Sequence, residues 1–310
     1  MRVLVTGASG FVGGAVARDL LAHGHAVVGL VRDPGRAAAL AGAGAQLRRG
    51  DMLSPETYVP LVAEVDAVVH AAQYATSGRF TRGAAARIRH ADHVMTDALA
   101  VACAAGGKRL VYTSGCFNYG DHGDDWITED TPFTPSPLGE GHAGEVLALR
   151  ERRARDGLDV VVLAPGFVYG PGGLFQSSFV DQLQANRLRV IGSGQNFWSP
   201  VHRDDLATAY LAAVTTAPAG GEYNITDGHP LRLRELVDQL TDAMGHKRVG
   251  TIPPILLKPL LGGPLVDSLT TSFRIGNDRA RVELGWRPRY PSFADGLPDT
   301  LAALDHHHPR

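Results

Sequence analysis

The sequence predicts an α/β fold, a doubly wound parallel sheet with a smaller C-terminal lobe. Short β-branched segments alternate with Ala/Leu-rich helical stretches through the first half of the chain, and a glycine-rich turn joins the first strand to the first helix. Strands that alternate with helices form βαβ units, in which the strands run parallel and helices cover both faces of the sheet. The 310 residues suffice for one large domain, or for a domain and a lobe.

The expected elements follow in the order that such a sheet requires. Strands are expected at residues 2–6, 26–31, 67–70, 109–113 and 160–164, with helices at 13–23, 35–43, 84–105 and 139–155. The first helix carries an apolar stripe of Val16, Leu20 and Leu21. After residues 170–173 the alternation of strands and helices becomes irregular. There we expect a strand at 222–226, a helix at 232–244, and a packed loop or short helices at 252–264.

No clean linker divides the chain, so we expect two interleaved units. The first is a nucleotide-binding core at residues 1–170, completed by residues 200–226. The second is a substrate-binding lobe at residues 171–199 and 227–305. Residues 306–310 are expected to form a frayed tail.

Composition excludes several classes of protein. Hydrophobic residues make up 44% of the chain and charged residues 20%, which is typical of a globular protein. The net charge of −2 lacks the basic excess of a nucleic-acid binder, and no apolar run reaches the roughly 18 residues of a membrane span. The two cysteines, Cys103 and Cys116, fit neither a disulfide framework nor a zinc site. We therefore expect a cytoplasmic protein with no metal, no nucleic-acid partner and no membrane partner.

The glycine turn at residues 6–13 predicts a Rossmann-like dinucleotide site. Gly7 allows a tight turn, Gly10 lets the backbone approach a pyrophosphate, and Gly13 lets the helix pack closely against the sheet. The amino end of the following helix presents unpaired N–H groups to the phosphates. A glycine-rich turn without a ligand is the alternative. The cofactor contacts expected in this turn are Gly7, Ser9, Gly10, Phe11, Val12 and Gly13.

The end of the second strand bears on the choice between NAD(H) and NADP(H). An NAD site places a carboxylate at this strand tip to accept from the ribose hydroxyls, but Val31 stands there and Arg32 follows it. A guanidinium suits a 2′-phosphate, so NADP(H) is favoured over NAD(H). The alternative is a solvated Arg32, with Asp33 serving the ribose.

Six segments spread over most of the chain form a specific signature. They are Thr6–Gly13, Gly50–Met52, Val68–Ala72, Lys108–Gly120, Ala164–Gly172 and Pro200–Ala207. With them the chain resembles the short-chain dehydrogenase/reductase superfamily, in particular its extended, epimerase/dehydratase-like branch. The resemblance implies cofactor contacts at Asp51, Met52, Ala71, Ala72, Thr113, Pro165, Gly166 and Val168, from the adenine end to the nicotinamide end. It also implies that residues 200–205 close the substrate side, although these residues could equally tie the two units together.

The chain departs from this family at the acid–base residues. The family uses a tyrosine as proton donor and, four residues later, a lysine that lowers the pKa of that tyrosine and holds the ribose. Aligning Glu145 with the glutamate common after the lysine puts Pro137 at the tyrosine and Gly141 at the lysine. No tyrosine lies between residues 119 and 169 and no lysine between residues 108 and 247, so no register restores the pair. The chain is therefore identified as an atypical member.

His142, one position from the absent lysine, is the leading candidate for proton transfer. Leu138, His142 and Glu145 share a helix face, so Glu145 could orient the imidazole. The alternative is a solvated histidine in the first helical turn. Tyr119 and Ser114 are weaker catalytic candidates. The side chains expected to line the substrate pocket are Tyr74, Cys116, Tyr169, Trp198 and His202.

These observations favour an NAD(P)(H)-dependent enzyme acting on a small organic substrate, by reduction or epimerisation. Two alternatives stay open. One is a non-redox isomerase, dehydratase or cyclase on the same fold, and the other is a non-catalytic dinucleotide-sensing regulator. A monomer and a homodimer both stay open as well.

Overall fold

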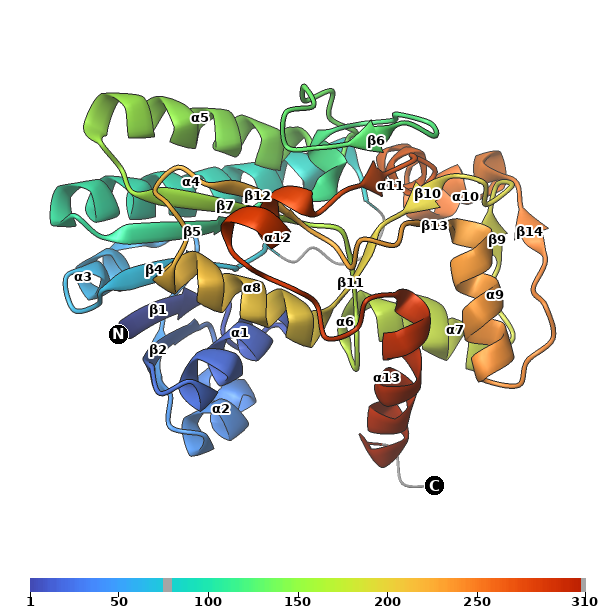
Figure 1. Ribbon diagram of the computed structural model, residues 1–310, viewed down its shortest axis with the longest axis horizontal. Helices are drawn as coiled ribbons and strands as arrows, with labels where there is room; N and C mark the ends of the chain where they lie inside the picture. The colour runs from blue at the N-terminus through green and yellow to red at the C-terminus, as the bar shows by residue number, and fades with distance from the viewer. Residues whose placement is uncertain (75–79, 308–310) are drawn as a thin grey trace.

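A seven-stranded parallel sheet forms the centre of the computed structural model, which describes residues 1–74 and 80–307 (Figure 1). All six pairs of neighbouring strands run parallel. The order reverses between β1 and β4, and in open α/β sheets ligands bind at the carboxyl ends of the strands beside such a reversal. In spatial order the strands are β12 (Glu222–Ile225), β7 (Val160–Pro165), β5 (Arg109–Thr113), β4 (Ala67–His70), β1 (Arg2–Thr6), β2 (Ala26–Val31) and β3 (Gln46–Arg49).

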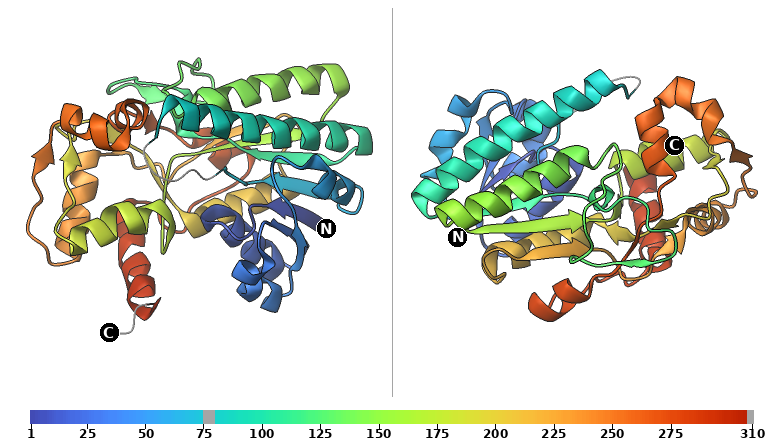
Figure 2. Two further views of the ribbon diagram at one scale, coloured as in Figure 1. Left: turned by 180° about the vertical axis from the view of Figure 1, so that it is seen from behind. Right: turned by 90° about the horizontal axis from the view of Figure 1, so that it is seen from above.

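Helices cover both faces of the sheet, because successive strand residues are apolar on both sides. One face packs against α3 (Val59–Val62), α4 (Arg82–Gly106) and α5 (Glu140–Asp156). The other face packs against α1 (Phe11–Ala22), α2 (Ala38–Gly42), α8 (Arg203–Thr215) and α12 (Asp278–Glu283). Figure 2 shows α4 and α5 side by side along their face. The expected doubly wound architecture is confirmed.

The lobe lies beyond the carboxyl ends of the strands (Figure 1). It has its own aromatic and aliphatic core, which includes Tyr169, Phe175, Trp198 and Leu236. Four two-stranded pairs are β8 (Phe167–Tyr169) with β11 (Pro200–His202), β9 (Val190–Ile191) with β14 (Thr251–Ile252), β10 (Phe197–Trp198) with β13 (Leu231–Arg232), and β6 (Trp126–Ile127) with β15 (Arg274–Ile275). The helices outside the sheet layers are α6 (Gly173–Phe175), α7 (Asp181–Gln184), α9 (Leu233–Ala243), α10 (Pro254–Leu261), α11 (Gly263–Leu269) and α13 (Phe293–His307).

Four short helical turns complete the described chain. They are η1 (Pro34–Ala37), η2 (Pro55–Thr57), η3 (Cys116–Asn118) and η4 (Gln176–Val180). No helix among the described residues combines the length and apolarity needed to cross a membrane.

Several elements differ from their expected form. Helix α1 starts at Phe11, two residues earlier than expected, because the turn itself feeds into the helix. Segment 252–264 forms short helices, but Ile255, Leu256 and Leu260 are exposed and not packed. Helix α13 reaches His307, so its last two residues fall in the expected tail, and residues 308–310 lie outside the described part.

Candidate active site

The glycine turn between β1 and α1 has the geometry of a phosphate cradle. Gly7 has a φ of +66°, and a Cβ atom on it would lie 2.8 Å from the Cα of Ala72. A Cβ atom on Gly13 would lie 2.4 Å from the carbonyl oxygen of Gly7, so only glycine allows α1 to start this close to the strand. Gly10 precedes α1 as its N-cap and brings no side chain of its own. The first amides of α1 therefore stay available to an anion, which fits a dinucleotide pyrophosphate.

Thr6 connects this turn to the next strand. Its Oγ1 accepts hydrogen bonds from the backbone N–H groups of Ala71 and Ala72, each at 3.1 Å. The same oxygen lies 2.9 Å from Nδ1 of His70. The bonds to Ala71 and Ala72 hold both residues against Gly7, where the resemblance places cofactor contacts. Sequence reasoning missed Thr6, although a hydroxyl residue ending an apolar strand was a readable signal.

The carboxyl ends of β2 and β3 present two guanidinium groups. Arg32 follows β2 and is exposed, and the neighbouring residue Val31 pairs with Arg49, which is also exposed. Asp33 is engaged locally, since its Oδ1 accepts from the N–H of Gly35 at 2.9 Å and caps η1. Asp51, just beyond β3, likewise accepts from the N–H of Leu53, and Met52 is buried beside it. Arg49 was not singled out from the sequence.

The expected nicotinamide end lies where β7 leads into β8. A Cβ atom on Gly166 would lie 2.0 Å from the carbonyl oxygen of Ser199, so Gly166, which follows Pro165, packs backbone to backbone. Val168 pairs with Val201 in the next strand. Thr113 uses its hydroxyl internally, donating to the carbonyl oxygen of His70 at 2.7 Å. Pro165, Gly166, Val168 and Thr113 thus gather at the carboxyl edge, while their contacts to a cofactor stay a prediction.

Phe11 is covered from the lobe side. A Cβ atom on Gly173 would meet the Phe11 ring at 2.7 Å, and the guanidinium of Arg203 lies 5.3 Å from the ring centroid. The side chain of Phe11 is therefore a packing group, and only its backbone remains to meet a phosphate.

A polar rung crosses the carboxyl end of the sheet on the face covered by α4 and α5. Thr6, His70 and Tyr112 are direct cross-strand neighbours. Two residues earlier on the same face, the corresponding rung is Leu4, Val68 and Leu110. The apolar pattern of this face is therefore broken at its carboxyl end, where an open α/β sheet binds its ligands.

Two further polar groups meet this rung from the helices. Asp92 on α4 accepts from the Tyr112 hydroxyl at 2.9 Å, and its other oxygen lies 3.7 Å from Nε2 of His70. His142 on α5 lies with its Nδ1 2.9 Å from the Tyr112 hydroxyl and 3.5 Å from Asp92. Burial lowers the pKa of His70 to about 4 and raises the pKa of Tyr112 far above its ordinary value.

The prediction that Glu145 orients His142 is wrong. Glu145 instead accepts from Nδ1 of His93 on α4 at 2.9 Å, and Asp92 and Tyr112 take its place beside His142. Both residues face α4, but His142 lies beside Asp92 and also reaches Tyr112 of β5, whereas Glu145 lies on the side of α5 that meets His93. Gly141 lies on that side too, and a Cβ atom on it would be 2.9 Å from Cγ of Arg89.

The other catalytic candidates lie in the interior. The Tyr119 hydroxyl donates to Oδ1 of Asn224 at 2.8 Å, and burial raises the pKa of this tyrosine well above its usual range. Ser114 is buried and accepts from the side chain of Asn118 at 2.7 Å. Burial raises the pKa of the Cys116 thiol to about 12. The structure brings none of these three side chains to His142, so we do not carry them forward as proton donors.

The remaining expected pocket residues divide between the two units. Tyr169 and Trp198 lie in the lobe core, and Tyr74 packs against the core between the sheet and α4–α5. His202 accepts from the N–H of Asp204 at 3.2 Å as the N-cap of α8, and burial lowers its pKa to about 4. The indole N–H of Trp198 and Nε2 of His202 are buried without a partner among the described residues.

Asp205 supplies the tie between the units that was an alternative role for residues 200–205. Its two carboxylate oxygens accept from the backbone N–H groups of Arg289 and Tyr290, at 2.8 and 3.0 Å. Its carbonyl oxygen also accepts from the indole of Trp286. This carboxylate is fully occupied inside the fold.

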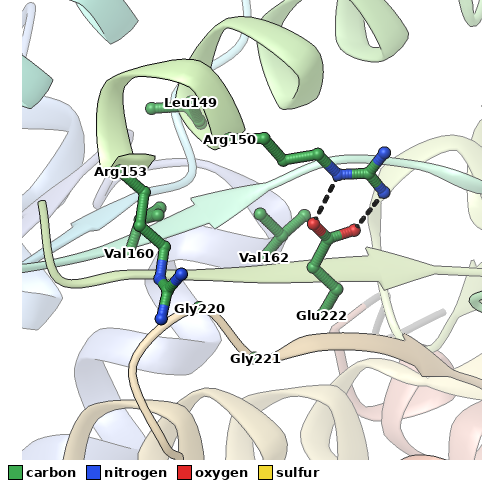
Figure 3. A pocket seen from close by; sticks show the side chains of 8 residues that line it. All are labelled: Leu149, Arg150, Arg153, Val160, Val162, Gly220, Gly221 and Glu222. Atoms are coloured by element: carbon green, nitrogen blue, oxygen red, sulfur yellow. Dashed lines mark hydrogen bonds and ion pairs between the residues drawn. The ribbon is translucent and has the colours of Figure 1, made fainter. Parts of the chain in front are cut away.

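A surface hollow lies far from this edge, at the amino end of β7 (Figure 3). Arg150 is already paired with Glu222 through two hydrogen bonds of 2.6 Å, and Arg153 donates to the carbonyl oxygen of Ala219. Glu222 therefore neutralises the charge of Arg150, and Arg153 is held by a backbone oxygen. Among the described residues, no group of three or more His, Cys, Asp or Glu side chains is arranged to hold a metal ion.

Comparison with known proteins agrees with this geometry. The sequence profile of the NAD dependent epimerase/dehydratase family matches residues 3–226. A 3-diazoavenalumate denitrifying reductase from Streptomyces is 33% identical over 310 residues, covering 96% of this chain and 99% of the relative. A 2-alkyl-3-oxoalkanoate reductase from Stenotrophomonas maltophilia is 35% identical over 265 residues, covering 80% of this chain and 77% of the relative.

A solved structure shows the same fold over the whole chain. It is the dTDP-glucose 4,6-dehydratase DesIV from Streptomyces venezuelae with NAD and TYD bound, which is 27% identical. The two structures superpose with a TM-score of 0.82 over 99% of this chain and 98% of that one.

Proposed function

Because the chain belongs to the NAD-dependent epimerase/dehydratase family, we propose that this enzyme is an NADP(H)-dependent reductase of a small organic substrate. The observation that carries the proposal is that the chain keeps the cofactor turn at Gly7–Gly13 but has Pro137 and Gly141 where the resemblance expects the tyrosine and lysine of the family. The full-length similarity to a reductase supports it.

The missing pair favours reduction over chemistry that starts by oxidising the substrate. An epimerase or dehydratase of this kind must first remove a hydroxyl proton, which needs a strong base such as a lysine-tuned tyrosinate. In reduction the bound cofactor supplies the hydride, and the remaining step is protonation of the product. An imidazole or water can supply that proton at neutral pH. Pro137 and Gly141 therefore fit an enzyme that runs in the direction of reduction, in which imidazole or water suffices as the acid.

The preference for NADP(H) is supported by the charges at the tips of β2 and β3. Arg32 and Arg49 are both exposed there, and Asp33 is already used as a cap. Guanidinium groups donate to phosphate oxygens in a fork that suits a 2′-phosphate. The residues that would hold the rest of the dinucleotide are the turn at Gly7–Gly13 and Ala71–Ala72.

Two measurements test the proposal. Calorimetric titration should show tighter binding of NADPH than of NADH, and Arg32→Ala should remove about 1–3 kcal/mol of that difference. The exposed Arg187→Ala, in the lobe, is the matched control and should leave both affinities unchanged. Equal affinities of the parent protein for the two cofactors would contradict the assignment of Arg32.

Net oxidation of NADPH should then be followed with a 2-alkyl-3-oxoalkanoate and with 4-carboxybenzenediazonium, against a reaction without enzyme. These two substrates represent the acceptor types in the names of the two relatives. Turnover of either supports a reductase. Tightly retained cofactor with no net oxidation would favour the isomerase or dehydratase alternative, and binding without any turnover would favour a regulator.

A further inference from the structure

The polar rung contains two sets of hydrogen bonds, Thr6 with His70 and Tyr112 with Asp92 and His142, whose proton positions follow from counting donors. A threonine hydroxyl has one hydrogen, and Oγ1 of Thr6 already accepts from two backbone N–H groups. Its hydrogen must therefore point to Nδ1 of His70 at 2.9 Å. Neutral His70 then carries its own hydrogen on Nε2, facing Asp92 at 3.7 Å.

The same counting fixes the proton positions of Tyr112 and His142. The Tyr112 hydroxyl donates its hydrogen to Asp92, so its oxygen can only accept from Nδ1 of His142. His142 is therefore the Nδ1–H tautomer, and its Nε2 has a free lone pair. The hydrogen bonds from His142 to Tyr112 and from Tyr112 to Asp92 therefore both point toward Asp92.

Resting on the proposed reductase function, we propose that Nε2 of His142 is the atom that gives the product its proton. Tyr112 and Asp92 are positioning residues that hold the imidazole in this tautomer. Thr6 and His70 form a separate hydrogen-bonded pair, and Nε2 of His70 faces Asp92 at 3.7 Å, beyond hydrogen-bond distance.

The side chain of His142 is more exposed than those of the residues hydrogen-bonded around it. Its side chain is 21% exposed, whereas the side chain of His70 is 1% exposed and that of Asp92 is 10% exposed. His142 is thus the member that can exchange protons with a substrate or with solvent. It stands at the carboxyl edge, in the first turn of α5.

The charged and titratable groups around His142 come from three directions. From the sheet they are Tyr112 of β5 and, next to it, His70 of β4. From α4 they are Asp92 and, beside Gly141, Arg89. From α5 itself they are Glu140, which pairs with Arg89, and Glu145, which pairs with His93. Asp92 is the only carboxylate among the described residues within 4 Å of the His142 ring nitrogens.

The proposed step balances for a ketone. The carbonyl carbon receives the hydride, and the electron pair of the C=O π bond moves to the oxygen. That oxygen takes the proton from Nε2 of protonated His142, so the product is the alcohol and the imidazole becomes neutral. Solvent then returns the proton to His142. An arenediazonium ion needs no proton at all, because hydride replaces nitrogen gas directly.

The first test needs neither cofactor nor substrate. Imidazole ¹⁵N NMR of the protein labelled at histidine should show His142 as the Nδ1–H tautomer, with Tyr112→Phe shifting it toward the ordinary Nε2–H form. His93→Gln removes a histidine that is also paired with a carboxylate, and it should leave the His142 signals unchanged. An Nε2–H tautomer in the parent protein would overturn the proposal, whatever the variants do.

The second test separates proton transfer from hydride transfer. His142→Gln should lower kcat for the 2-alkyl-3-oxoalkanoate roughly 10²-fold, while the rate with 4-carboxybenzenediazonium and the affinity for NADPH stay within about twofold. Equal losses with both substrates would assign His142 a structural role and leave the reductase function standing. If the parent protein turns over neither substrate, the reductase function itself is rejected.

Discussion

Asp227 follows β12, and its side chain has an unusual setting for a carboxylate. It is 4% exposed, its Oδ1 accepts from the N–H of His229 at 2.8 Å, and its Oδ2 has no partner among the described residues. Burial raises its pKa from 3.8 to about 8, and the nearby Asp205 and Asp295 add to the effect. We therefore expect Asp227 to be protonated in the folded protein at neutral pH.

The direction of the pH effect on stability follows from comparing the protonation of Asp227 in the folded and the unfolded protein. Between about pH 4 and pH 8 the folded protein holds a proton on Asp227 that the unfolded chain has released, so its contribution to stability falls as pH rises through this window. Above pH 8 both states are ionised, and the loss is complete. One pH unit is worth about 1.4 kcal/mol, so the full loss is on the order of 5 kcal/mol.

Asp227→Asn should recover most of this loss. An amide oxygen still accepts from His229, and no charge has to be buried. Relative to the parent, the free energy of unfolding should be nearly unchanged at pH 4.5 and higher by several kcal/mol at pH 8.5. Urea denaturation followed by tryptophan fluorescence at six or more pH values measures the difference.

Comparing the two proteins at each pH isolates Asp227. Burial also lowers the pKa of His70 and His202 to about 4, but both proteins share these histidines and their effects cancel in the difference. Asp278→Asn, at a side chain 93% exposed, is the matched control and should show no trend with pH. A stability difference for Asp227→Asn that is independent of pH, or negative at pH 8.5, would refute the reasoning.

Three further outcomes are expected. Gly13→Ala should weaken NADPH binding at least tenfold in a fluorescence titration, because its Cβ would lie 2.4 Å from the backbone oxygen of Gly7. Gly144→Ala is the control and should bind NADPH normally, because a Cβ atom there would meet nothing within 4 Å. Asp205→Asn should lower the free energy of unfolding in urea by about 1–3 kcal/mol, since an amide can accept only one of the two N–H groups it faces; an unchanged midpoint would contradict the tie. His202→Gln should reduce the stability lost on acidification from pH 6.5 to pH 4, because the parent protein must bury a neutral histidine that the unfolded chain protonates; equal acid profiles in thermal melts would count against it.

The parallel sheet could be predicted because its signals are local. β-branched runs, Ala/Leu-rich helices and a glycine turn can each be recognised within a few residues. The right-handed chirality of βαβ units then determines how the strands are connected. The edge strand β3 was missed because Gln46–Arg49 alternates only weakly and lies at the rim of the sheet. Helix α8 went unrecognised because its charged residues all lie in the first turn and the apolar residues that follow form no clear stripe, and α13 because Gly and Pro interrupt its apolar residues.

The cofactor turn could be placed from sequence, and the surroundings of His142 could not. The turn depends on spacing within residues 6–13, which a sequence displays directly. The partners of His142 come from α4 and β5, and helix periodicity on α5 alone pointed to Glu145. Which of two carboxylates meets a histidine depends on how two helices rotate against each other, and that is decided by packing over the whole face of the sheet.

The pairing of β12 with β7 has a consequence for the growing chain on the ribosome. Strand β7 is apolar and fully buried, with β5 on one side and β12 on the other. Residue 222 must leave the exit tunnel before β12 can pair with it. Until then the unpaired N–H and C=O groups of β7 form an open edge, which is a template for pairing with other chains. A long interval of synthesis therefore exposes this edge, and chaperone binding at β7 would protect the nascent protein from aggregation.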